Sequence, residues 1–545
     1  MQALRAARPA RLAVQRLAVP DSCAALPAAR SRGIVAARPS PAAPETAFGI
    51  LQLLQENTGP TPAGPGAHGG AGQVLSVTNG LVRIMLPGPV AVGHAVDVGG
   101  RLGVVLHYDA RCAVAALVPE GFPRNGDSVR VLGPRISLRG LDVPEAGSAR
   151  AVALPDLLAT GGASVLKLPE MPPPQCRRPV TRHMPSGLAA VEALMPLGEG
   201  HRVGFVGPPR TGKSAAVDML MRSQKEDTVC VYATQAPPLR VEQKLEGAPG
   251  AAAAVVVIHP GSASPCARYL LPLCAIQAAS QLRNKHRHVL LVLDDLTVFA
   301  QAAKELGTPP LGAPHVLAAA LGAAGAVGGG GRESALSVAL VLDMSPEEQL
   351  APVFKGLWRG VEPALDICLS FDGRLAAQGV FPAIGLDQFR AAGFPPPYQA
   401  PLLGQLRRQL VEKLRLHHEL ESKHEMSKQL GLHEEANETE SLDSMRVARA
   451  LFAHGAERPP QELAVLLAAA AVYHFWRPRS AATVTRFQDA VIGTVRAAYP
   501  DMWRDLCALD SLSESEANRL LSDLGAALLR HRFDFELTRP EFWRG

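Results

Sequence analysis

The spacing of apolar residues changes twice along the 545-residue chain. From Gly72 to about Leu141, apolar and polar residues alternate, a spacing typical of strands that bury one face. Asn79-Gly80 interrupts this alternation and is a strong signal for a hairpin turn. Because further short strands and turns follow, residues 72–141 are expected to form a small antiparallel β-barrel.

The second region, residues 177–391, contains apolar runs of strand length separated by stretches long enough for helices. Continuous apolar runs are typical of parallel strands buried on both faces, so a central α/β domain is predicted. Gly322–Gly331 is almost entirely glycine and alanine, which predicts a flexible loop. The expected strands are Val203–Val206, Thr228–Ala233, Ala253–Ile258, Val289–Leu293, Ala335–Asp343 and Leu365–Ser370.

In the third region, from Pro396 onward, apolar residues recur at helical spacing, which predicts a C-terminal α-helical bundle. Ser513 and Glu516 have the spacing of a capping box at the start of the last long helix. One apolar stripe is formed by Leu402, Leu403, Leu406, Leu410 and Leu414.

The first 45 residues differ from the rest of the chain. They are rich in arginine and alanine, and Asp21 is the only acidic residue before Glu45. This composition is typical of an organelle transit peptide, with a disordered basic tail as the alternative. The chain is therefore predicted to contain a transit peptide (1–45), an N-terminal segment and linker (46–71), the barrel (72–141), an irregular connector (142–176), the α/β domain (177–391) and the helical domain (392–545).

Composition narrows the class of protein. Hydrophobic residues make up 47% and charged residues 19%, and the formal charge of +5 is thinly spread, so no surface for a polyanion is indicated. The eight cysteines show no C-x-x-C spacing, which argues against a zinc site or a disulfide framework. The longest apolar stretches, Ala251–Ile258 and Leu463–Tyr473, are too short to span a bilayer.

The clearest chemical signal is Gly207–Ser214, which fits the P-loop pattern G-x-x-x-x-G-K-[ST] between a predicted strand and a predicted helix. In such a loop, backbone N–H groups and the helix N-terminus bind phosphate oxygens. Lys213 would contact the outer phosphates and the Ser214 hydroxyl would bind Mg²⁺. A chance glycine-rich turn is the alternative. The candidate phosphate-binding residues are Gly207, Arg210, Thr211, Gly212, Lys213 and Ser214.

A carboxylate follows the apolar run Val289–Leu293, at the edge of a parallel sheet where ligands bind. Asp294 is expected to hold Mg²⁺ through water, with Asp295 in support. An Asp pair that caps the next helix is the alternative interpretation.

The order barrel, P-loop domain and helical bundle resembles the alpha subunit of the F-type ATP synthase, and the Arg-rich leader favours the mitochondrial form. The resemblance implies bound ATP or ADP with Mg²⁺ and an alternating hetero-hexameric ring with catalytic beta subunits. It also implies central and peripheral stalk partners and peripheral attachment to the matrix side of the mitochondrial inner membrane. The segments that carry it are residues 72–84, 177–214, 264–296 and 462–491.

The residue at position 235, Gln235, favours a resemblance to the alpha subunit over the catalytic beta subunit. It stands where the catalytic beta subunits carry a glutamate, and an amide cannot act as a carboxylate base. The resemblance therefore implies a site that binds nucleotide without hydrolysing it. Gln429 aligns with an adenine-contacting glutamine of the family.

Several positions depart from the family pattern. Pro208 and Pro209 each remove one N–H from the loop. The family's arginine finger aligns with Gly373, so Arg374, one residue later, is a candidate displaced finger. On a regular strand Arg374 would face away from the neighbouring subunit, whereas a bulge at Gly373 would restore its direction. The segment Thr308–Gly331, charged and aromatic in the family, is mostly alanine and glycine here.

Two other functions fit the same fold class. The first is a degenerate alpha paralogue with a structural or assembly role, favoured by these departures. The second is a hexameric nucleic-acid translocase, which would need aromatic and basic side chains on its barrel for base stacking. Residues 72–141 contain only Tyr108 and Phe122 as aromatics, so no nucleic-acid partner is expected.

Overall fold

The computed structural model describes only part of the chain, and the predicted transit peptide, the linker and Gln429 lie outside it. All structural statements below refer to the described residues. These are residues 72–78, 81–86, 95–109, 112–117, 121, 123–133, 137–138, 140–159, 164–165, 176–236, 253–262, 264–306, 317–318, 321–329, 332–344, 352–377, 381–385, 390–391, 400–412, 452, 458–472 and 481–531.

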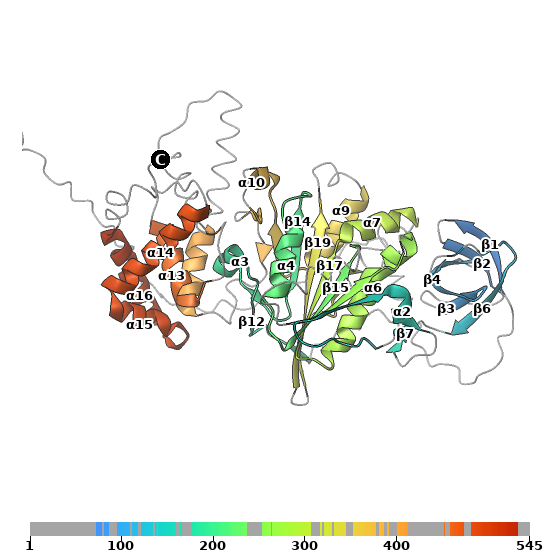
Figure 1. The fold of residues 1–545 in the computed structure, drawn as a ribbon, viewed down its shortest axis with the longest axis horizontal. Coiled ribbons are helices and arrows are strands. Elements are labelled where there is room, and N and C mark those ends of the chain that lie inside the picture. Colours follow the sequence, from blue (N-terminus) through green and yellow to red (C-terminus); the bar gives the residue numbers. More distant parts are fainter. Residues whose placement is uncertain are drawn as a thin grey trace, which may run out of the picture. The chain divides into compact units, whose positions relative to one another are not determined.

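The barrel predicted from the alternating pattern is confirmed. Its six strands close in the order β1-β2-β5-β4-β3-β6, and each neighbouring pair is antiparallel. Thr78 pairs with Leu81, so β1 and β2 form the expected hairpin. Val82 and Ile84 are buried inside, whereas Arg83 between them is exposed. The strands, blue in Figure 1, are β1 (Gly72–Thr78), β2 (Leu81–Met85), β3 (Ala95–Val98), β4 (Arg101–Asp109), β5 (Cys112–Leu117) and β6 (Ser128–Gly133).

The α/β domain is built on a sheet whose central strands are parallel, in the order β20-β14-β19-β17-β15-β16-β8. Each apolar run predicted as a strand forms one. The strands are β14 (Arg202–Gly207), β15 (Thr228–Thr234), β16 (Ala254–His259), β17 (His288–Asp294), β19 (Arg332–Asp343) and β20 (Ile367–Ser370).

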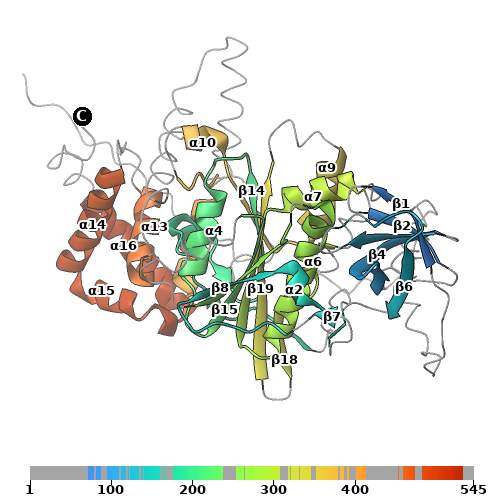
Figure 2. The ribbon, with the colours of Figure 1, turned by 45° about the vertical axis from the view of Figure 1, so that its right-hand side comes forward.

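Helices cover both faces of this sheet. Helix α4 (Lys213–Arg222) lies on one face, and α6 (Pro265–Arg283) and α7 (Leu296–Glu305) lie on the other (Figures 1 and 2). In β17, Val292 packs into the core on the α4 face, whereas Leu291 and Leu293 pack toward α6 and α7. Successive residues of a strand point to opposite faces of the sheet, and here both faces are buried. Residues on both faces are therefore apolar, which explains the continuous apolar runs in the sequence.

The prediction of an irregular connector over residues 142–176 is wrong in part. Strand β8 (Ala149–Ala153) extends the sheet by pairing parallel with β16. Helix α2 (Leu154–Leu157) follows it directly. As an edge strand, β8 keeps Arg150 exposed and is only half-buried elsewhere, so it lacks the apolar run that marks the central strands.

The prediction of a flexible loop over Gly322–Gly331 is also wrong for the residues that the structure describes there, 322–329. Residues Gly325–Gly329 form β18, which makes an antiparallel hairpin with the start of β19. Two arginines fix the chain just before it: Arg177 donates to Gly322 O at 2.8 Å and Arg283 to Ala323 O at 2.6 Å. Backbone pairing and these charged donors outweigh the low strand propensity of glycine.

The C-terminal region is helical, as predicted. Residues 401–412 are helical, and Leu402, Leu406 and Leu410 are buried. Ser513 and Glu516 form the predicted capping box at the start of α16. None of the helices in the described part of the chain is both long and apolar enough to cross a membrane. The labelled helices of this region are α13 (Pro460–Val472), α14 (Ala481–Ala498), α15 (Pro500–Cys507) and α16 (Glu514–Arg530), with the 3-10 turn η4 (Leu509–Ser511) between α15 and α16.

Shorter elements complete the described fold. They are β7 (Ser137–Leu138), β9 (Leu158–Ala159), β10 (Ser164–Val165), β11 (Arg177–Arg178), β12 (His183–Met184), α3 (Ala189–Leu194), β13 (Leu197–Gly198), α9 (Pro352–Val361), η3 (Glu362–Ala364), α10 (Gly373–Ala377) and β21 (Arg390–Ala391).

Candidate nucleotide-binding site

The predicted P-loop connects the end of β14 to the start of α4. Gly207 has no room for a side chain, since a Cβ atom there would lie 2.4 Å from the carbonyl oxygen of Phe371. Gly212 has a φ of +92°, a left-handed conformation that glycine adopts without strain, and it immediately precedes the first residue of α4. Both glycines of the pattern are therefore required by the backbone path of the loop.

The donors of the loop are fewer than in an ordinary P-loop. Pro208 and Pro209 carry no N–H, whereas residues 210–214 each retain one. Arg210 is exposed and has a φ of +63°. Thr211 is buried, and its hydroxyl donates to Pro208 O at 2.8 Å. Ser214, in the first turn of α4, is exposed.

Lys213 is held inside its own loop. Its side chain is only 3% exposed and forms an ion pair with Asp343, with 2.6 Å between Nζ and Oδ1. The ammonium also donates to Gly207 O at 2.9 Å and to Pro208 O. Lys213 therefore lies at the place that the P-loop pattern predicts, with protein oxygens around it.

Asp294 lies at the carboxyl end of β17 and shares the P-loop face of the sheet. It accepts a hydrogen bond of 2.6 Å from the phenol of Tyr232, which packs in the core on the α4 side. Burial and the nearby Asp294 charge raise the pKa of Tyr232, so the phenol stays protonated and acts as a donor.

Asp295 serves as the cap of the next helix. Its carboxylate accepts from the backbone N–H of Thr297 at 2.5 Å, at the first turn of α7. Burial raises the pKa of Asp295 to about 6, and the charges of Asp343 and Asp294 act in the same direction. The capping interpretation is therefore right for Asp295.

The donors at this edge suit magnesium. The Ser214 hydroxyl and the Asp294 carboxylate are hard oxygen ligands of the kind that Mg²⁺ prefers. Within the described ranges, no group of three or more His, Cys, Asp or Glu side chains could hold a metal alone. A metal bound by Ser214 and Asp294 would therefore need oxygens from phosphate and water, which is how Mg²⁺ binds together with nucleotides.

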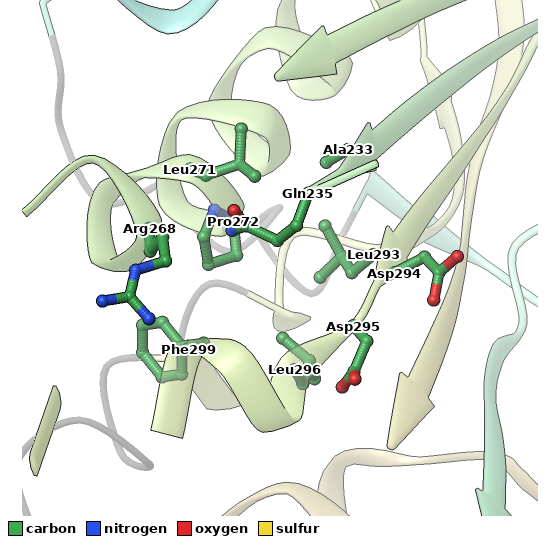
Figure 3. A pocket seen from close by; sticks show the side chains of 10 residues that line it. All are labelled: Ala233, Gln235, Arg268, Leu271, Pro272, Leu293, Asp294, Asp295, Leu296 and Phe299. Atoms are coloured by element: carbon green, nitrogen blue, oxygen red, sulfur yellow. The ribbon is translucent and has the colours of Figure 1, made fainter. Parts of the chain in front are cut away.

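Gln235 follows β15 and lines a small pocket together with Asp294, Asp295 and residues of α6 and α7 (Figure 3). Its side chain is directed toward Pro272, whereas Asp294 is directed away from it. Arg268, in the same pocket, forms an ion pair of 2.7 Å with Glu305. The ten residues that line this pocket include none from the loop Gly207–Ser214.

Arg374 does not lie on a strand, so the expectation based on strand register or a bulge at Gly373 is wrong. Strand β20 ends at Ser370, and α10 begins at Gly373 because Asp372 Oδ1 accepts from the Arg374 N–H at 2.8 Å. The Arg374 side chain is 64% exposed, with Nε 3.6 Å from Asp372 Oδ2. A Cβ at Gly373 would lie 3.8 Å from Pro208 Cγ, so α10 starts beside the P-loop of its own chain.

Two residues of the site were not found from the sequence, Asp343 and Tyr232. Asp343 ends a predicted apolar strand in the same way as Asp294 does, and this was the available signal. It lies beside the P-loop because β19 pairs with β14, with Gly207 opposite Asp343. Tyr232 is one of three hydroxyl-bearing residues of β15, and nothing in the sequence pairs it with Asp294.

A parallel sheet with a P-loop between β14 and α4, and an acidic residue at the end of β17, defines a P-loop nucleotide-binding α/β domain. Residues 187–314 match the ATP synthase alpha/beta family, nucleotide-binding domain. Residues 187–314 are thus similar to the nucleotide-binding domain of the ATP synthase alpha/beta family.

Two curated relatives agree with this class. The chain is 31% identical over 275 residues to ATP synthase subunit alpha 2 of Syntrophotalea carbinolica, covering 48% of this chain and 51% of that protein. It is 30% identical over 253 residues to ATP synthase subunit alpha 1 of Nitrosomonas eutropha, covering 43% and 48%. The chain spans about half the length of these relatives. Similarity to alpha subunits, inferred above from short segments, is confirmed.

Proposed function

We propose that this chain is a non-catalytic, nucleotide-binding alpha-type subunit in the head of a proton-transporting F-type ATP synthase. The observation that carries the proposal is the contact of the P-loop lysine, Lys213, with Asp343 at the carboxyl end of β19, in a domain similar to that of alpha subunits.

The ligand is ATP or ADP with Mg²⁺. Backbone N–H groups of residues 210–214 would bind phosphate oxygens, aided by the positive end of α4. Lys213 and Arg210 supply positive charge, and Thr211 supports the loop through Pro208 O. Ser214 and Asp294 would hold the metal, which neutralises phosphate charge. Gln429, expected near the adenine, lies outside the described residues.

The absence of a carboxylate at position 235 supports a non-catalytic role. Hydrolysis needs a group that orients and activates the attacking water, and an amide cannot accept the proton. In addition, Gln235 is directed toward Pro272 on the α6 side of the sheet, away from Asp294 (Figure 3). Nucleotide at this site would therefore act as a structural or regulatory ligand.

The proposed partners are those that the resemblance to alpha subunits implies. An alpha-type subunit would alternate with catalytic beta subunits in a hetero-hexameric ring and contact central and peripheral stalk subunits. Residues 1–45 support location in mitochondria, on the matrix side of the inner membrane and peripheral to it. In that place the ring would couple proton translocation to ATP synthesis.

A structural or assembly subunit with little nucleotide-dependent function is the second candidate. Pro208 and Pro209 remove two donors from the phosphate cradle, and the ammonium of Lys213 is surrounded by oxygens of its own chain. This arrangement weakens phosphate binding without abolishing it, since residues 210–214 keep their N–H groups.

The test uses the purified full chain. Binding of MgATP and MgADP is measured by isothermal titration calorimetry, and ATP hydrolysis is measured by phosphate release. We expect binding without turnover, and Lys213→Ala should weaken binding by at least about tenfold because it removes a charged phosphate contact. Turnover that Lys213→Ala abolishes would contradict the non-catalytic role. Failure of the wild-type chain to bind any nucleotide would favour the structural role.

A further inference from the structure

Asp343 occupies a position from which it acts directly on the P-loop lysine. It is the last residue of β19, the strand that lies between β14 and β17 in the sheet. Its carboxylate is 2.6 Å from Lys213 Nζ, so the pair is in direct contact. The lysine side chain is 3% exposed, whereas the Asp343 side chain is 36% exposed and borders the solvent.

The ammonium of Lys213 has three hydrogens, and protein oxygens accept all of them. The acceptors are Gly207 O, Pro208 O and Asp343 Oδ1, with Thr211 Oγ1 further away at 3.4 Å. A nucleotide phosphate can contact Nζ only if one of these contacts is exchanged. Asp343 is the only one of these acceptors that carries a full negative charge.

The backbone holds Asp343 in this place. The Asp343 N–H donates to Thr297 Oγ1 at 2.9 Å, and the Thr297 hydroxyl is 3.2 Å from Asp343 O. The next residue, Met344, donates its N–H to Gly207 O at 2.9 Å. These bonds tie the end of β19 to both α7 and the P-loop, so the Asp343 backbone stays beside the loop and keeps the carboxylate within reach of Lys213.

We propose that Asp343 is an internal competitor for Lys213 that limits the affinity of the loop for nucleotide phosphates. The inference rests on the proposed function, because the ligand it opposes is the phosphate chain of ATP or ADP. Asp343 acts in two ways: it occupies the lysine, and it repels a phosphate that approaches the same ammonium. Magnesium bound by Ser214 and Asp294 offsets part of that repulsion.

The experiment compares wild-type protein with Asp343→Asn, which keeps the shape and one oxygen acceptor but removes the charge. Binding of ATP and of ADP is measured by calorimetry, each with Mg²⁺ and with excess EDTA. We expect the dissociation constants of Asp343→Asn to fall by about tenfold, with the larger gain in EDTA, since no cation then screens the phosphates. Asp366→Asn is the matched control, because Asp366 pairs with Arg202 at the opposite edge of the sheet.

The outcomes separate this inference from the proposed function. If wild type binds nucleotide and Asp343→Asn binds no tighter, Asp343 is no competitor while the proposed function stands. If Asp343→Asn binds nucleotide more weakly than wild type in Mg²⁺ but equally well in EDTA, Asp343 is a metal ligand and the inference is overturned. If wild type binds nothing while Asp343→Asn binds, the inference is supported. If neither binds, both it and the proposed function fail.

A second variant guards against misfolding. Asp343→Ser retains a hydroxyl acceptor near Lys213, and its melting curve by circular dichroism shows whether the fold is intact. A folded Asp343→Ser protein with wild-type affinity would overturn the inference even where Asp343→Asn could not be purified.

Discussion

Tyr232 on β15 donates its phenolic hydrogen to the carboxylate of Asp294 on β17 across 2.6 Å. The two residues lie on adjacent parallel strands, on the P-loop face of the sheet. Because the phenol orients the carboxylate, Tyr232 controls the residue that is expected to bind the metal.

Tyr232→Phe should weaken the contribution of Mg²⁺ to nucleotide binding by about tenfold, since partners that orient a metal ligand typically affect metal affinity on this scale. The measurement is the ratio of ATP dissociation constants with and without Mg²⁺. Binding in EDTA should change little. Tyr269→Phe is the control, because Tyr269 stacks on Phe299 on the other face of the sheet. An equal loss in both conditions would show that Tyr232 supports the fold rather than the metal.

His288 should make the protein less stable as the pH falls. It is buried, with ring nitrogens 3.1 Å from Thr228 Oγ1 and 2.9 Å from Ser337 Oγ, and burial lowers its pKa to about 3. Below the unfolded value of about 6.5 the unfolded chain takes up a proton and the folded chain does not. The free energy of unfolding should thus fall by up to about 1.4 kcal/mol per pH unit between about pH 6.5 and 3.

Urea unfolding of wild type and His288→Gln between pH 7 and 4.5 would measure this effect. Asp295 acts in the opposite direction, because its pKa of about 6 lies above the ordinary value of 3.8. It favours the folded state below about pH 6 and loses that contribution as the pH rises. Only the difference between the two proteins therefore reports on His288. Parallel pH profiles would exclude His288 as the cause.

Arg407 should be important for stability. It is 3% exposed and donates to Glu192 O at 2.6 Å and to Ala193 O at 2.7 Å, near the end of α3. Arg407→Ala removes charge-assisted bonds and leaves buried carbonyls without this donor, at a cost of about 3 kcal/mol. The urea midpoint should fall, whereas exposed Arg408→Ala should leave it within error. Equal midpoints for the two variants would contradict the prediction.

Arg374→Ala should leave the ATPase rate of a ring reconstituted with beta subunits within about twofold of wild type. Arg374 follows the Asp372 cap, and the residue before it, Gly373, lies beside Pro208 of its own chain. Loss of a working arginine finger would instead lower the rate by ~10³–10⁵. Exposed Arg359→Ala serves as the control. A collapse seen with Arg374→Ala alone would establish a displaced finger.

The leader prediction can be tested separately from the rest of the chain. Residues 1–48 fused to a fluorescent protein should direct it to mitochondria. Exchange of Arg5, Arg8, Arg11 and Arg16 for glutamine should leave the reporter in the cytosol, because import depends on the positive charge of the leader. Cytosolic fluorescence from the unchanged fusion would refute the leader and weaken the mitochondrial proposal.

Apolar periodicity was sufficient to predict the barrel, the central strands and the C-terminal helices. It failed for β8 and β18, because an exposed edge strand and a glycine-rich strand have no apolar pattern to read. Strand β8 is held by a partner distant in the sequence, as in the pairing of Arg150 with Val256. Strand β18 pairs with the adjacent start of β19 and, on its other side, with the distant Arg177 and Arg178.

The sequence predicted those parts of the candidate site whose residues are adjacent in the chain. The P-loop and Asp294 are recognised from adjacent residues, whereas Asp343 depends on the order of strands in the sheet. Only the position of β19 between β14 and β17 brings Asp343 to Lys213. The strand pattern does not extend to Arg374, because Asp372, an acid two residues earlier, accepts from its backbone N–H and starts a helix there.

The burial of Arg407 has a practical consequence for anyone who divides this chain into fragments. One continuous hydrophobic cluster contains Ala216 of α4, Leu402 and Phe487 of α14. A fragment cut at residue 391 would expose that cluster to water and leave the carbonyl groups at the end of α3 without their arginine. The predicted boundary at residue 391 therefore falls inside one continuous hydrophobic core, so nucleotide binding is best measured on protein that retains the C-terminal helices.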